Sequence, residues 1–92
     1  GINKNISTSQ INKWLHQVVE TNPHPRINGK EVKFKYGTQI SKSPLTIKIF
    51  SNFSNEISRS YKKYLLNNFY SYFKIKSRNL KIYISKSNNP YN

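Results

Sequence analysis

Residues 57–73, ISRSYKKYLLNNFYSYF, form the most regularly patterned segment of the chain. No glycine or proline interrupts it, and its apolar side chains recur at steps of three and four residues, as on one face of an α-helix. This stripe consists of Ile57, Tyr61, Leu65, Phe69 and Tyr72, flanked by Tyr64 and Phe73. The opposite face carries Arg59, Lys62, Lys63, Leu66 and Tyr70. We therefore predict a helix with one side toward a core and a basic, partly aromatic side free for another contact.

A second helix is predicted earlier in the chain, over residues 8–21. Ser7 is a good N-cap, and Gln10 stands three residues later, which is the spacing of a capping box. Ile6 and Ile11 are placed to form a hydrophobic staple around the same helix end. Prolines beyond residue 21 prevent the helix from continuing. Its apolar stripe consists of Ile11, Trp14, Leu15, Val18 and Val19.

Three segments alternate between apolar and polar side chains and are predicted to be β-strands: residues 30–40, 45–51 and 80–85. A turn at residues 41–44 joins the first two as a hairpin. The side chains predicted to face the core are Val32, Phe34, Tyr36, Ile47, Ile49, Leu80, Ile82 and Ile84. The other face would carry Lys33, Lys35, Lys48, Phe50, Lys81 and Tyr83. The position of the third strand in the sheet stays open.

The predicted order is α-β-β-α-β. Two helices can cover one face of a three-stranded sheet, so the fold class is α+β with both helices on the same face. A chain of 92 residues is long enough for one such domain. We place the domain at residues 7–92 and treat residues 1–6 as a linker.

The charge of the chain is strongly unbalanced. Sixteen Lys and Arg face three Glu, which gives a formal net charge of +13. Such a field attracts polyanions, either nucleic acid or an anionic membrane surface. A bias toward AT-rich codons would explain Lys in place of Arg, but not the shortage of acids. Lysines interleaved with aromatic rings suit RNA, because phosphates attract lysine and bases stack on rings; the alternative is an ordinary solvated sheet face.

Residues for catalysis or metal binding are missing from the sequence. The chain has no cysteine and no glycine-rich phosphate loop of the G-x-x-x-x-G-K-[ST] type. His16 and His24 stand alone, without the cluster that a metal site needs. The carboxylates of Glu20, Glu31 and Glu56 are not paired for acid–base chemistry. We therefore predict no catalytic residue and no metal in this chain. No apolar run approaches the length of a membrane-spanning helix, so we predict no membrane span either.

Several segments in order resemble the C-terminal domain of the bacterial GTPase family Der, also called EngA. The matching segments are ISTSQINKWL, NPHPRINGKEVKFKYGTQI, SPLTIKIFSN, SYKKYLLNNFYSYF and the closing NPY. They run from Ile6 to Tyr91, which is nearly the whole chain. A short match such as STS would by itself be weak evidence for the family, whereas the ordered set of segments is specific.

The resemblance implies a KH-like module that follows two GTPase domains in a cytoplasmic protein. Members of the family act in late assembly of the large ribosomal subunit, so the implied partners are ribosomal RNA, the large subunit and the GTPase domains of the same polypeptide. GTP and magnesium would belong to those GTPase domains. This chain would then be a monomeric fragment without a cofactor of its own. It lacks the G-x-x-G loop of ordinary KH domains, and Lys48 stands where the family usually has an apolar residue, which makes the open sheet face more basic here.

The RNA contacts expected from sequence combine cations for phosphates with exposed rings for bases. The residues are Lys33, Lys35, Arg59, Lys62, Lys63, Lys74, Lys76, Arg78 and Lys81 for phosphates, and Tyr70 and Tyr83 for base stacking. Tyr36, Tyr61 and Tyr64 are assigned to the core or its edge. The main alternative is a protein-interaction module that docks on and regulates the adjoining GTPase domains, with RNA contact minor. A membrane-surface role is disfavoured because the sheet uses the apolar faces of both helices.

Overall fold

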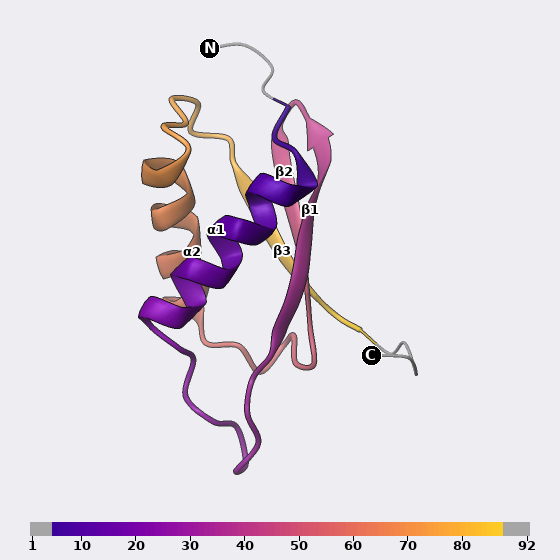
Figure 1. Ribbon diagram of the computed structural model, residues 1–92, viewed down its shortest axis with the longest axis vertical. Coiled ribbons are helices and arrows are strands. Elements are labelled where there is room, and N and C mark those ends of the chain that lie inside the picture. The colour runs from indigo at the N-terminus through magenta and orange to yellow at the C-terminus, as the bar shows by residue number, and fades with distance from the viewer. Residues whose placement is uncertain (1–4, 88–92) are drawn as a thin grey trace.

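The computed structural model describes residues 5–87, and its elements follow the predicted order (Figure 1). The elements are α1 (Thr8–Thr21), β1 (Phe34–Lys42), β2 (Leu45–Ser51), α2 (Arg59–Tyr72) and β3 (Lys81–Lys86). Both helices lie on one side of the sheet, and no other element of residues 5–87 covers the opposite side, which we call the bare side (Figure 1). The α+β prediction is confirmed. The closing NPY of the resemblance lies outside the described residues.

The sheet has the strand order β1-β2-β3. β1 is antiparallel to β2, whereas β3 is parallel to β2. A parallel neighbour requires a crossover, and α2 supplies it between β2 and β3. This arrangement makes β2 the central strand, so Ile47 and Ile49 on its helix-facing side are completely buried.

The beginning of α1 has the predicted caps. Ser7 Oγ accepts a hydrogen bond from the Gln10 backbone N–H (3.1 Å), and Gln10 Oε1 accepts one from the Ser7 N–H (3.2 Å). Ile6 and Ile11, predicted as the staple, are both buried. The Ile6 N–H also donates to Gln39 Oε1 on β1 at 2.8 Å. Hydrogen bonds within the helix end and a hydrogen bond to β1 therefore both fix the start of α1.

The core-facing stripe of α2 is shorter than predicted. Tyr61, Leu65 and Phe69 are buried, but Tyr72 is 42% exposed. Phe73, the residue after the helix, packs against Phe69 with ring centroids 4.5 Å apart. Phe73 thereby fills the last core position, so the assignment of Tyr72 to the apolar stripe was wrong.

The first strand also differs from its prediction. It begins at Phe34 rather than residue 30, and its register against β2 shifts between Phe34, opposite Ser51, and Tyr36, opposite Phe50. One extra residue in a strand reverses the alternation of side chains beyond it. Phe34 consequently stacks on Tyr61 of α2 at 5.5 Å, whereas Tyr36 stacks on Phe50 of the bare face at 4.8 Å. The assignment of Tyr36 to the core was wrong for this reason.

A side-chain amide joins α1 to the free edge of β1. Asn12 Oδ1 accepts from the Gly37 N–H (2.8 Å), and Asn12 Nδ2 donates to the Gly37 carbonyl (3.0 Å). Asn12 thus satisfies the two edge groups that a neighbouring strand would otherwise bond. The approach is close, because a Cβ at Gly37 would lie 3.1 Å from Ile11 Cγ2.

We expect Asn12→Ala to destabilise the domain, because it leaves both polar groups of the Gly37 backbone without this partner. The expected loss is about 1–3 kcal/mol in the free energy of unfolding, measured by urea denaturation. Asn67→Ala is the matched control, since Asn67 is an exposed residue of α2 and gains the same helix propensity. Equal midpoints for the two variants would contradict this role of Asn12.

Tyr61 connects α2 to the end of α1 and supplies a second test. Its hydroxyl donates to the Asn22 carbonyl at 2.8 Å. Burial raises the pKa of Tyr61 to about 12 from 10.0, and the neighbouring Tyr64 adds to the rise. Because the folded pKa is the higher one, this stabilisation is complete below about pH 10 and is lost as the pH rises toward 12.

We expect Tyr61→Phe to lower the free energy of unfolding at pH 7 by about 0.5–1.5 kcal/mol. Between pH 10 and 12 the variant should lose less stability than the wild type, because it has no hydroxyl to ionise at this position. Urea titrations at each pH measure both effects. Tyr83→Phe, at an exposed position, should leave the stability at pH 7 unchanged. If Tyr61→Phe lost as much free energy of unfolding between pH 10 and 12 as the wild type, ionisation of the Tyr61 hydroxyl would not be the cause of the alkaline loss.

Candidate nucleic-acid interface

The positive charge of the domain is almost free of internal neutralisation. Within residues 5–87, no Lys or Arg lies within 4.0 Å of a carboxylate, and the contact of this kind found there joins His16 Nε2 to Glu20 Oε2 at 3.6 Å. Glu56 accepts a hydrogen bond from the Ser54 backbone N–H at 3.2 Å. Backbone hydrogen bonds from Glu56 itself and from Ser54 lower its pKa, and the positive charge of Lys86 adds to this effect. None of the three carboxylates belongs to a strand of the sheet.

The RNA-contacting residues predicted from sequence do not form a single surface. An α2 group consists of Arg59, Lys62 and Lys63, all exposed on that helix. A loop group consists of Lys74, Lys76 and Arg78, all exposed between α2 and β3. Lys81 and Tyr83 belong to β3, on the bare side of the sheet. Because the helices cover one side of the sheet only, the α2 group and the β3 residues lie in opposite layers of the domain (Figure 1).

Lys33 and Lys35 do not take the positions predicted for them on an alternating strand. Lys33 precedes β1, and its backbone N–H donates to Asn52 Oδ1 at 2.8 Å. Lys35 stands at the register shift between Phe34 and Tyr36. The alternation that assigned both lysines to the bare face therefore does not hold at this end of β1. Both side chains are exposed.

Tyr70 attaches the loop group to α2. Its hydroxyl accepts a hydrogen bond from the Leu80 backbone N–H at 3.2 Å, and the Arg78 guanidinium carbon lies 5.9 Å from its ring centroid. The ring is half-buried and packs against the core, so it is less open than the sequence suggested. The loop lies at the C-terminal end of α2, where cations interact favourably with the helix dipole.

The bare side of the sheet combines aromatic rings with lysines. We call this surface the open face and define it by Tyr36, Thr38, Lys48, Phe50, Lys81 and Tyr83. Thr38, Lys48 and Tyr83 are register partners across the three strands. Lys48 Nζ lies 5.3 Å from the Phe50 ring centroid. Tyr36 and Tyr83 are 45% and 52% exposed.

Sequence reasoning assigned Lys48, Phe50, Lys81 and Tyr83 to this side of the sheet but missed Tyr36. The signal that would have placed Tyr36 is the register shift near Lys35, which depends on pairing with β2. Lys48 and Phe50 were outside the predicted RNA-contacting set. Their position on the central strand between two exposed tyrosines makes them part of the same surface.

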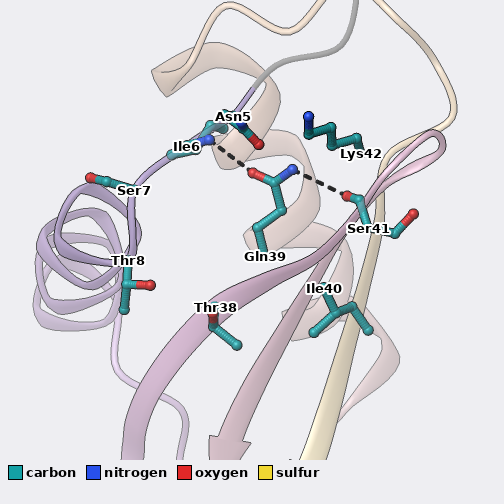
Figure 2. Close-up of a pocket in the computed structure, with 9 residues that line it drawn as sticks. All are labelled: Asn5, Ile6, Ser7, Thr8, Thr38, Gln39, Ile40, Ser41 and Lys42. Atoms are coloured by element: carbon teal, nitrogen blue, oxygen red, sulfur yellow. Dashed lines mark hydrogen bonds between the residues drawn. The ribbon is translucent and has the colours of Figure 1, made fainter.

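A pocket of about 600 Å³ lies between the start of α1 and the end of β1 (Figure 2). Figure 2 shows Gln39 in its centre, where Oε1 accepts from the Ile6 N–H (2.8 Å) and Nε2 donates to the Ser41 carbonyl (3.3 Å). Lys42 is the one ionisable side chain in the lining. The lining therefore contains no carboxyl group or histidine with which Lys42 could pair for acid–base chemistry.

A metal site and a membrane-spanning helix are both absent from the described part of the chain. Residues 5–87 contain no group of three or more His, Cys, Asp or Glu side chains able to hold a metal ion. No helix in the same range has the length and apolar character needed to cross a membrane. The basic surfaces are thus the features of this domain that suggest a function.

Comparison with known proteins relates this chain to one family. Residues 5–84 match the family described as the KH-domain-like C-terminal domain of EngA bacterial GTPase enzymes. The GTPase Der of Rickettsia canadensis (strain McKiel) is 41% identical over 90 residues, which cover 97% of this chain and 20% of that protein. The GTPase Der of Buchnera aphidicola subsp. Schizaphis graminum is 39% identical over 88 residues, covering 96% of this chain and 19% of the relative. The chain thus spans about a fifth of the length of these relatives. It belongs to the family of KH-domain-like C-terminal domains of EngA (Der) GTPases.

Proposed function

We propose that this domain is a non-catalytic module through which a Der-type GTPase contacts ribosomal RNA of the large subunit during ribosome assembly in the cytoplasm. The observation that carries the proposal is the charge distribution. Sixteen cations face three carboxylates, and within residues 5–87 none of the Lys or Arg side chains forms an ion pair. GTP and magnesium would bind elsewhere in the longer polypeptide, because this chain has neither a phosphate loop nor, in the described residues, a metal cluster.

The two cationic groups on the helical side suit an RNA backbone. The α2 group lies in the first turns of α2, and the loop group follows its last turn. A helix of 14 residues is about 21 Å long, so the two groups lie near opposite ends of a basic track. Phosphate contacts of this kind position RNA without reading its sequence, and their strength falls steeply with salt.

A second function is supported by the separation of the basic surfaces. The open face and the α2 group lie on opposite sides of the domain, so one side can bind RNA while another contacts protein. The curated relatives are about five times as long as this chain, which leaves ample polypeptide for such a contact. We therefore retain docking on the adjoining GTPase domains as the alternative function.

The experiment that tests the proposal compares the affinity of the domain for large-subunit ribosomal RNA fragments and for unrelated RNA of equal length, across a salt series. We expect a preference for ribosomal RNA that survives physiological salt. Combining Lys62→Ala with Lys63→Ala should weaken binding, and the slope of log K against log salt should become shallower by about 1.5–2.

The matched control combines Lys13→Ala with Lys30→Ala, which removes the same charge from exposed positions on α1 and in the loop before β1. It should weaken binding less than the α2 pair does. Equal affinity for both RNAs, lost with salt and reduced equally by both double variants, would mean that the charge acts only by nonspecific attraction. Docking on the GTPase domains would then become the favoured function.

A further inference from the structure

We propose that the open face binds unstacked bases of single-stranded RNA. This inference rests on the proposed RNA-contacting function, and it adds the class of RNA and the surface that receives it.

The open face presents two tyrosine rings to solvent from the outer strands. Tyr36 on β1 is 45% exposed and Tyr83 on β3 is 52% exposed. Tyr36 is held in place by its stack on Phe50, with centroids 4.8 Å apart and ring planes 24° apart. An aromatic ring that is both exposed and fixed loses little side-chain freedom when a base stacks on it.

Lysines lie beside these rings on the same face. Lys48 is the register partner of Tyr83 and also lies over Phe50, with Nζ 5.3 Å from the ring centroid. Lys81 precedes Tyr83 by two residues, so alternation places it on the same side of β3. From strand spacing and rise, the positions of Phe50 and Tyr83 are about 8 Å apart. Lys48 therefore stands where a phosphate between two stacked bases could be neutralised.

The backbone of β1 is irregular at the position that makes this surface. The register shift between Phe34 and Tyr36 turns Tyr36 away from the core and onto the open face. Regular pairing from Phe34 onward would place Tyr36 with the buried side chains instead. Bulges often re-aim a side chain beside a functional site, and here the redirected side chain is one of the two exposed rings.

The chemistry of the open face favours RNA over a protein partner and a single strand over a duplex. Lys48 and Lys81 provide positive charge, and no strand of the sheet contributes a carboxylate. Lysine is depleted in the cores of protein interfaces. A duplex keeps its base faces stacked inside the helix, so only unpaired bases can lie on exposed rings.

The test measures the affinity of the whole 92-residue chain for three probes of equal length at physiological salt. The probes are a single-stranded RNA decamer, an abasic ribose-phosphate oligomer with the same phosphates, and a ten-base-pair RNA duplex. The variants are Tyr83→Leu and Tyr83→Phe. The control is Tyr72→Leu, which removes an exposed tyrosine from the end of α2. Equal thermal unfolding midpoints would show that the variants remain folded.

We expect the wild type to bind the single strand about tenfold more tightly than the abasic oligomer for each stacked base, and more tightly than the duplex. Tyr83→Leu should reduce this preference about tenfold, whereas Tyr83→Phe and Tyr72→Leu should retain it. Tyr36→Leu should act in the same direction as Tyr83→Leu.

Equal affinity for the single strand and the abasic oligomer would overturn the inference, as would equal effects of Tyr83→Leu and Tyr72→Leu. RNA would then be held by its phosphates alone, the proposed function would stand, and a protein partner would become the favoured occupant of the open face. Failure of all three probes, and of ribosomal RNA fragments, to bind at physiological salt would overturn both the inference and the proposed function.

Discussion

The edge-to-face contact between Trp14 and Phe69 determines which surfaces of this domain remain available. The ring centroids are 4.9 Å apart, and both side chains are completely buried. Because Trp14 belongs to α1 and Phe69 to α2, their contact holds the two helices together, and both lie on the same side of the sheet. Trp14 Nε1 donates to Asn68 Oδ1 at 2.8 Å, so the indole is buried without an unsatisfied donor. With both helices on one side, nothing in residues 5–87 covers the other side.

Much of this arrangement could be predicted because local signals and packing agree. The bounds of α1 match their prediction, since the capping box at Ser7 and the prolines after the helix act independently of the rest of the fold. The position of β3 could not be read in the same way, because a parallel neighbour of β2 is specified by the crossover through α2 rather than by alternation in β3. Tyr36 and Tyr72 were misassigned for a related reason. A bulge and the packing of Phe73 decide their environments, and neither is visible in a periodic pattern.

For the candidate site, the sequence likewise predicted the types of residue better than their positions. The abundance of lysine and the shortage of carboxylates follow directly from composition, and they indicate a polyanionic partner. Composition does not show that the cations occupy opposite layers, because that depends on which face each element presents. A chain of net charge +13 will bind almost any nucleic acid at low salt. Specificity must therefore come from contacts that charge does not supply, and exposed rings on the open face are of that kind.

Two functions can coexist in so small a domain only if they use different surfaces. Phosphates that neutralise the α2 group, or bases that stack on the open face, exclude another domain from the same area. The remaining element with a large exposed surface is α1, whose 14 residues include a single lysine and the His16–Glu20 pair. Its surface is polar and nearly uncharged, so a protein partner there would meet little repulsion and would leave the open face free. Docking through α1 therefore does not compete with bases stacked on the open face, whereas docking through the sheet does.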